Sequence, residues 1–301
     1  MTILITGEEI SKVLGIAVPD DIEIDQLVPL GYPFQGRVLS FLTSERYISL
    51  LLKSSALPYA IFLLPELKEK VPASIITIAV DDPVWFFYSL FNYLALKKEH
   101  IKTYQSPLAK IHSSAVISSV GVHISDGVIV EPRAVIMPGV FLGEDVVVRA
   151  GAVIGVDGFE HKRTSKGILS VVHDGQVRLE AGVEVGPNCT VIKGFSYRDT
   201  VLGGFTKLDA MVHFAHCAQC GEECLIAANA MIAGSAQIGS SVWIGPSASV
   251  SSQVKIGDHA KVTLGAVVTK DVDSYQQVSG NFAVPHQMFL KHVISVSRGK
   301  S

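Results

Sequence analysis

An apolar residue returns at every sixth position through most of the second half of the sequence. Helical side chains repeat with a period of about 3.6 residues and strand side chains with a period of 2, so neither explains a period of six. Short strands joined by tight corners do, with three six-residue units and about 18 residues in each coil. The series predicts a parallel β-helix whose core consists of Ile124, Val130, Ile136, Leu142, Val148, Ile154, Leu202, Leu208, Phe214, Cys220, Ile226, Ile232, Ile238, Ile244, Val250, Ile256, Val262 and Val268.

Two other positions of the unit support this fold. The residue after the core residue is often glycine or alanine, as at Gly221, Ala233 and Gly239. A larger side chain would crowd the corner there. The fifth position is small or β-branched, as at Ala230 and Val242. Roughly twenty units agree, so we expect a mainly β protein built on this coil.

Length and charge restrict the class of protein. The chain has 301 residues, a net charge of -3 and 48% hydrophobic residues, which is enough for a large core and two domains. The near-neutral charge argues against nucleic acid or an anionic membrane as the main partner. No run approaches 18 apolar residues, and the N-terminus carries acids where a secretory signal carries lysines. We therefore expect a cytoplasmic protein without a membrane span.

Residues 1–105 lack the six-residue period and are expected to form a small α/β domain. Residues 59–64 and 74–80 are short apolar runs typical of buried strands. Residues 46–55 are a helix candidate, and a second helix is expected over 85–96, because Asp82 can cap it and Pro83 suits its first position. The β-helix is then predicted over 106–272. Residues 273–301 are expected to close its open end with a helix near 287–293.

Two interruptions of the repeat are expected to form loops at a binding face, since insertions in coiled repeats often do. The longer one, between Ile154 and Leu179, is charged and should leave the coil as an excursion. The shorter one lies between Val191 and Leu202. The candidate binding residues in these segments are Asp157, Phe159, His161, His173 and Lys193.

The cysteines allow two interpretations. With His213 and His216, residues Cys217, Cys220 and Cys224 make the pattern H-x-x-H-C-x-x-C-x-x-x-C, which has the spacing of zinc ligands. The register gives a simpler account, because Cys220 occupies a core position and Cys189 and Cys224 occupy small-residue positions. Free cysteine commonly behaves as a small buried hydrophobe, so we expect no metal.

His216 is the best candidate for chemistry. It follows a small residue at a corner, so its side chain should project outward, with Asp209 seven residues before it and Gly234 one full coil of 18 residues after it. An imidazole suits general base catalysis near neutral pH, and a backbone N–H can stabilise an oxyanion. A base and an oxyanion donor are what acyl transfer to an amine or a hydroxyl requires, and we expect direct attack of an acceptor amine on a thioester. His213 either lines the same cleft or only occupies a corner.

Several motifs resemble those of the UDP-3-O-acylglucosamine N-acyltransferases of lipid A biosynthesis. The run Asp199-Thr200-Val201-Leu202-Gly203 is similar to their D-T-x-I-G, and Phe214-Ala215-His216 to their I-A-H. Residues 154–159 resemble their G-A-D-G-F loop, and Ile232-Ala233-Gly234-Ser235 their A-G-S. Residues 39–47 resemble their uracil-binding F-x-x-N-x-x-Y motif.

The resemblance implies a left-handed, homotrimeric β-helix that moves an acyl group onto the amine of a nucleotide-linked sugar. It makes His216 the general base, Gly234 the oxyanion donor, and Phe41 and Tyr47 the pair that stacks on the base. Ser44 stands where the family has asparagine, and Gln253 where it has a second histidine. The donor would be acyl carrier protein or coenzyme A, with no tightly bound cofactor. The pathway would be lipid A or another surface glycan.

Two other functions stay open. One is a γ-type carbonic anhydrase, in which histidines such as His213 and His216 bind zinc between subunits. The other is a trimer that binds nucleotide sugars without catalysis.

Overall fold

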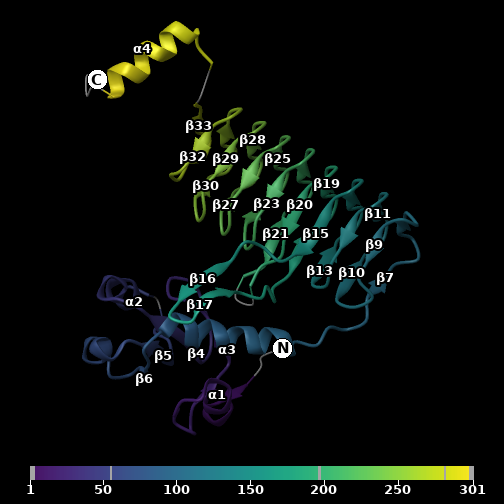
Figure 1. Cartoon of the computed structure of the whole chain (residues 1–301). Coiled ribbons are helices and arrows are strands. Elements are labelled where there is room, and N and C mark those ends of the chain that lie inside the picture. Colours follow the sequence, from purple (N-terminus) through teal and green to yellow (C-terminus); the bar gives the residue numbers. More distant parts are fainter. Residues whose placement is uncertain (1–3, 55, 196–197, 281–282, 298–301) are drawn as a thin grey trace.

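The computed structural model describes residues 4–54, 56–195, 198–280 and 283–297. It contains a small N-terminal α/β unit, a long three-sided coil, a hairpin that leaves the coil, and a C-terminal helix (Figure 1). No helix in these ranges combines the length and the apolar character that crossing a membrane requires.

The coil is a left-handed parallel β-helix in which every third strand stacks on the same face. The first face holds β7 (Tyr104–Gln105), β10 (Val122–Ile124), β13 (Val140–Leu142), β18 (Val177–Leu179), β21 (Thr200–Leu202), β24 (Gln219–Cys220), β27 (Gln237–Ile238) and β30 (Lys255–Ile256). The second face holds β8 (Lys110–Ile111), β11 (Ile129–Val130), β14 (Val147–Val148), β19 (Glu184–Val185), β22 (Lys207–Leu208), β25 (Leu225–Ile226), β28 (Trp243–Ile244), β31 (Lys261–Val262) and β33 (Gln277–Val278). The third face holds β9 (Val116–Ile117), β12 (Val135–Ile136), β15 (Val153–Val156), β20 (Thr190–Ile192), β23 (His213–Phe214), β26 (Met231–Ile232), β29 (Ser249–Val250) and β32 (Val267–Val268).

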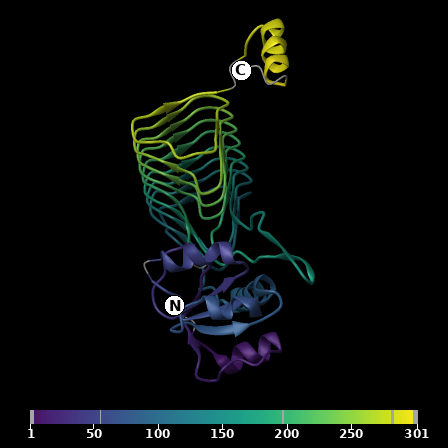
Figure 2. The ribbon, with the colours of Figure 1, turned by 90° about the vertical axis from the view of Figure 1, so that its left-hand side faces the viewer.

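The six-residue period is confirmed as the core of the coil. Every core position predicted from Ile124 to Val268 is buried in one continuous cluster, and the small residues of the fifth position fill the space between them. The corners use left-handed backbone at every sixth residue from Phe205 to His259, with φ between 55° and 64°. Because each unit turns the chain at such a corner, the residue before it is held at an edge of the prism. Figure 2 shows the resulting stack of coils, with the N-terminal unit below it.

The N-terminal unit has the expected strands and helices. A four-stranded parallel sheet contains β3 (Gln26–Leu27), β4 (Val38–Leu42), β5 (Ala60–Leu63) and β6 (Ile76–Ala79), while β1 (Ile5–Thr6) pairs with β2 (Glu23–Ile24). The helical segments are α1 (Gly7–Leu14), η1 (Glu45–Tyr47), α2 (Ile48–Leu52), η2 (Pro65–Lys70) and α3 (Pro83–Lys97). The predicted cap of α3 is confirmed, because Asp82 accepts a hydrogen bond from the N–H of Trp85 at 2.9 Å.

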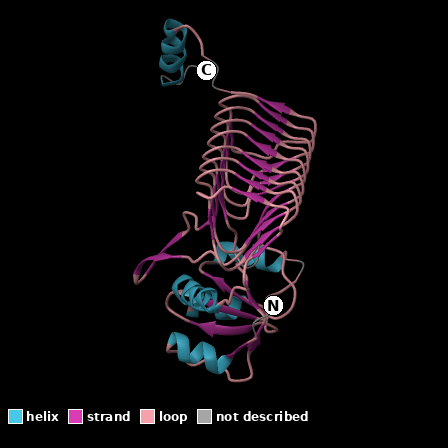
Figure 3. Ribbon diagram, turned by 90° about the vertical axis from the view of Figure 1, so that its right-hand side faces the viewer, coloured by secondary structure: helices cyan, strands magenta, loops and turns pink. Residues whose placement is uncertain are grey.

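The predicted excursion is confirmed as an antiparallel hairpin of β16 (His161–Thr164) and β17 (Gly167–Ser170), which projects from the side of the coil (Figure 3). It lies against α3. The amide of Asn92 donates to the carbonyl of Ser170 and accepts from the N–H of Val172. Val171, Phe195 and Cys217 also pack into the core of the N-terminal unit. The excursion therefore fixes this unit against the coil. Part of the second interruption, residues 196–197, lies outside the described residues.

The C-terminal helix, α4 (His286–Ser297), is confirmed in the expected region, but it does not close the coil in the single chain. Figure 1 shows it standing apart from the last strands. Its side chains Met288, Phe289 and Val296 are more than half exposed. The expected closure needs these apolar groups to pack on the coil, and here they do not.

Candidate active site

One cavity of about 620 Å³ lies where the N-terminal unit, the excursion and the coil meet. Its lining comes from all three parts. The N-terminal unit contributes Pro29, Leu30, Tyr32, Phe41, Thr43, Tyr47, Leu50, Val84 and Tyr88. The excursion contributes Phe159, Glu160 and Lys162, and the coil contributes Phe195, His216, Gly234, Ser235, Ser252 and Gln253.

His216 occupies the corner that follows β23, and its ring lies between two glycines. A Cβ atom on Gly234 would lie 2.4 Å from Cε1 and 2.6 Å from Nε2 of the imidazole. A Cβ atom on Gly158 would lie 3.3 Å from its Cδ2. The distances at Gly234 are shorter than any carbon contact allows, so the ring fits only because Gly234 has no side chain.

The two nitrogens of His216 have different surroundings. Nε2 lies 3.5 Å from Oε2 of Glu160, whose other oxygen pairs with Lys162. Nδ1 is buried and has no hydrogen-bond partner among the residues that the structure describes. Burial lowers the pKa of His216 below its ordinary value, and the charge of Glu160 opposes that shift. The ring is therefore neutral near pH 7, with Nε2 as the nitrogen available to the cavity.

Gly234 presents a backbone N–H beside this ring. Within the described part of the chain, that N–H donates no hydrogen bond, whereas the next N–H, of Ser235, donates to the carbonyl of His216 at 2.9 Å. A donor without an acceptor at a cavity wall can stabilise a negative oxygen of a bound molecule.

His173 lies behind His216, with 5.6 Å between the ring centroids. It is buried, its Nε2 accepts from the N–H of Gly158 at 3.3 Å, and its Nδ1 lies 3.2 Å from the carbonyl of Val171. Burial lowers its pKa to about 4, which agrees with one neutral tautomer donating through Nδ1. His173 thus holds the loop that covers His216.

The opposite wall is aromatic. Phe41 packs on Phe87 and Tyr88 at centroid distances of 4.8 and 5.7 Å. Tyr47 carries the guanidinium of Arg46 over its ring at 4.6 Å. A flat ring entering the cavity can stack on these side chains.

Comparison with known proteins gives consistent matches. A UDP-3-O-acylglucosamine N-acyltransferase of Granulibacter bethesdensis is 29% identical over 268 residues, which cover 74% of this chain and 73% of that enzyme. Another of the same name, from Rhizobium johnstonii, is 39% identical over 87 residues, 29% of this chain and 24% of that enzyme. A crystal structure of a UDP-N-acetylglucosamine acyltransferase covers 65% of this chain and 82% of its own, with 21% identity and a TM-score of 0.50. No family model matches the sequence.

These matches support an acyltransferase. The resemblance found in the motifs therefore extends over about three quarters of this chain and of the Granulibacter enzyme.

In the structure of this chain, one group of predicted residues lies together at the cavity and another group lies outside it. Those that line the cavity are Phe41, Tyr47, Phe159, His216, Gly234 and Gln253. Asp157 and Lys193 pair with each other at 3.0 Å outside this lining, and His161 bonds to Ser170. His213 is exposed on the third face, and so it occupies the outside of the coil.

Two predicted residues differ from expectation. Asp209 lies at the corner after β22, and its carboxylate accepts from the N–H groups of Ala210 and Ala228. Its separation from His216 in the acyltransferase chain follows from the fold, because each six-residue unit moves the chain to another corner. Ser44 is not among the residues that line the cavity, and its buried hydroxyl has no partner among the described residues.

Sequence reasoning missed Tyr32, Tyr88, Glu160 and Lys162. The two charged residues lie in the excursion that the sequence marked as a binding segment, but only its histidines, aspartate and phenylalanine were singled out. Tyr32 and Tyr88 come from parts of the N-terminal unit that carry no motif. Burial, and then the charge of Glu160, raises the pKa of Tyr88.

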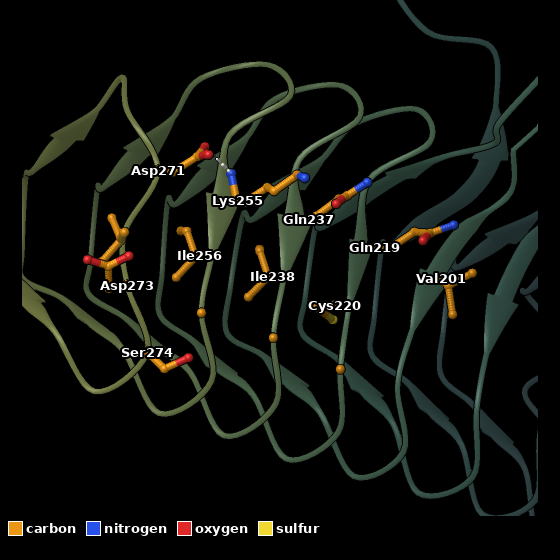
Figure 4. Close-up of a pocket in the computed structure, with 14 residues that line it drawn as sticks. Val201, Gln219, Cys220, Gln237, Ile238, Lys255, Ile256, Asp271, Asp273 and Ser274 are labelled. Carbon is orange, nitrogen blue, oxygen red and sulfur yellow. Dashed lines mark hydrogen bonds between the residues drawn. The ribbon is translucent and has the colours of Figure 1, made fainter. Parts of the chain in front are cut away.

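A second groove of about 720 Å³ runs along the first face of the acyltransferase, away from His216 (Figure 4). Gln219, Gln237 and Lys255 stand in a row above it, and Asp271 accepts from the N–H of Lys255 at 2.8 Å. All four cysteines are free and buried, and burial is what the register predicts for Cys189, Cys220 and Cys224. Among the described residues, no three His, Cys, Asp or Glu side chains are arranged to hold a metal ion.

Proposed function

We propose that this acyltransferase moves an acyl group from a thioester to the amine of a nucleotide-linked amino sugar. The observation that carries the proposal is the joint position of a neutral imidazole, a free backbone N–H and an aromatic wall around one cavity. The relatives are named for N-acylation of a UDP-linked sugar, which supports the same acceptor class and a place in lipid A or surface-glycan synthesis.

The chemistry follows from the groups present. The acceptor nitrogen gives a proton to Nε2 of His216 as it attacks the thioester carbonyl. The N–H of Gly234 then stabilises the oxygen of the tetrahedral intermediate. Collapse breaks the C–S bond and releases the thiol of coenzyme A or of acyl carrier protein.

The N-terminal unit is proposed to hold the nucleobase. Phe41 and Tyr47 offer aromatic surface at the cavity, and stacking tolerates either uracil or thymine. Ser44 and its free hydroxyl lie within the same segment, next to η1, and can bond a base edge if the segment adjusts.

We also propose a homotrimer. Apolar side chains such as Leu225 and Trp243 on the second face, and Met231 and Val267 on the third, are between 38% and 63% exposed in the single chain. Rows of this kind typify surfaces that pack on another subunit. Light scattering of the pure protein tests this, and a monomer at micromolar concentration contradicts it.

The decisive experiment incubates pure protein with UDP- and dTDP-linked amino sugars and with acetyl, 3-hydroxybutyryl and 3-hydroxymyristoyl thioesters of coenzyme A and of acyl carrier protein. Mass spectrometry identifies any acylated sugar. We expect one pairing to react and His216→Ala to slow product formation by a factor on the order of 100 or more. Binding of a nucleotide sugar without acylation by any donor instead identifies a non-catalytic binder, and zinc in elemental analysis revives the carbonic anhydrase alternative.

A further inference from the structure

Glu160 is the acidic side chain closest to the proposed reaction centre. It lines the cavity, its side chain is 19% exposed, and Oε2 lies 3.5 Å from Nε2 of His216. Lys162, whose amine also lies 4.8 Å from the centre of the Tyr88 ring, pairs with the other oxygen. One carboxylate oxygen thus faces the imidazole, and one is held by a cation.

The two oxygens of Glu160 are used differently. Lys162 pairs with one, whereas among the described residues Oε2 has a single long contact, with the imidazole of His216, and is left to accept from a molecule in the cavity. Its geometry would suit a bound group that carries positive charge and donates several hydrogen bonds. An alkylammonium ion is positively charged and has three N–H donors, whereas a hydroxyl is neutral and has one O–H donor.

We propose that Glu160 binds the acceptor as its ammonium ion and so selects an amine over a hydroxyl. The inference rests on the proposed function and names the form of substrate that the site takes. The ammonium lies between Oε2 of Glu160 and Nε2 of His216, within reach of both.

The proton balance is then complete. R–NH3+ first gives one proton to Nε2 of His216, which passes it to water, and the resulting R–NH2 stays against the carboxylate of Glu160. As the nitrogen forms the C–N bond it gives a second proton to Nε2 of His216, the C–S bond breaks, and the imidazolium gives that proton to the departing thiolate. R–NH3+ and a thioester thus yield an amide, a thiol and H+.

Binding of UDP-glucosamine and UDP-glucose tests this, because the two differ only in an amine or hydroxyl at one carbon. Titration calorimetry near neutral pH should show the wild type preferring the amine by roughly tenfold or more, the range of a charged hydrogen bond. Glu160→Gln, which keeps the shape of the side chain, should remove the preference. In the acylation assay it should raise the acceptor KM and leave the thioester KM unchanged.

Two control variants separate this role from a structural one. Glu180→Gln removes a carboxylate paired with Arg178 on the coil and should keep the preference. Lys162→Met removes the cation that pairs with Glu160 and should keep or strengthen the preference for the amine. If Glu160 only positions Lys162, both Glu160→Gln and Lys162→Met should lose that preference.

The outcomes also separate this inference from the proposed function. Suppose that the wild type acylates an amino sugar. If it then shows no preference for the amine, or if Glu160→Gln keeps that preference, the role of Glu160 is overturned while the proposed function stands. If the wild type binds neither nucleotide and acylates no amino sugar, the proposed function fails and the inference fails with it.

Discussion

Equivalent corner positions on successive coils stack into columns, and two of these columns have the same backbone arrangement but different roles. At the first-face corner, Glu222, Ser240 and Asp258 stack on successive coils, each two residues after a strand. The hydroxyl of Ser240 accepts from the N–H of Glu222 at 3.2 Å, and the carboxylate of Asp258 accepts from the N–H of Ser240 at 2.8 Å. At the third-face corner the same positions hold His216, Gly234 and Ser252, and the N–H of Gly234 donates to no described residue.

The difference shows how a repeat fold makes a site. Where a side chain from the next coil satisfies the corner N–H, the column only stabilises the stack. At the third-face corner Gly234 leaves room for the imidazole of His216. Among the described residues, Ser252 of the next coil does not accept from the Gly234 N–H, so this donor stays unused. The excursion and the N-terminal unit then enclose this corner and turn it into a cavity.

The largest expected effect comes from removing the imidazole. His216→Ala should reduce turnover by a factor on the order of 100 or more, since general base catalysis supplies about that much. The matched control is Ser240→Ala, at the same position of the other column, which should keep full turnover. Steady-state kinetics with circular dichroism as a check of folding measures both, and equal losses would contradict the distinction between the columns.

A smaller effect is expected from filling the space under the ring. The Cβ of Gly234→Ala would lie 2.4 Å from Cε1 of His216, so the ring must move, and turnover should fall by roughly 10- to 100-fold. Gly204→Ala is the control, because Gly204 occupies the same position at the first-face corner and its Cβ would have its nearest contact at 3.4 Å. Similar turnover in the two variants would show that the ring position at Gly234 is unimportant.

The pH dependence of kcat/KM, which reports the free enzyme, should reflect the neutral base. Because burial lowers the pKa of His216, activity should rise with pH through a midpoint below 6.5, the ordinary value for histidine. Glu160→Gln removes the charge that opposes this shift, so its midpoint should lie lower than that of the wild type. The groups that face the ring from the excursion and the coil are Glu160, Lys162, His173, Arg198 and His213. A midpoint that rises in the variant would contradict the electrostatic effect of Glu160 on His216.

The sequence predicts the coil more completely than the site, for a physical reason. A core position such as Ile232 has to be apolar in every unit, so the period is visible along the chain. The contact between His216 and Glu160 joins residues 56 positions apart, and it depends on how the excursion folds back over a corner. The spacing of His216 and Gly234 was readable because both belong to the coil. Asp209 was misplaced because closeness in sequence means a different corner in this fold.

The smallest expected effect tests the ordinary column. Asp258→Ala removes the acceptor of the Ser240 N–H at an exposed corner, where water can replace it in part. The free energy of unfolding should fall by about 1 kcal/mol or less, the value of one such hydrogen bond. Turnover should not change, because this column has no cavity and no base. Urea denaturation beside the kinetic assay measures both, and a loss of turnover at full stability would mean that the first-face groove takes part in the reaction after all.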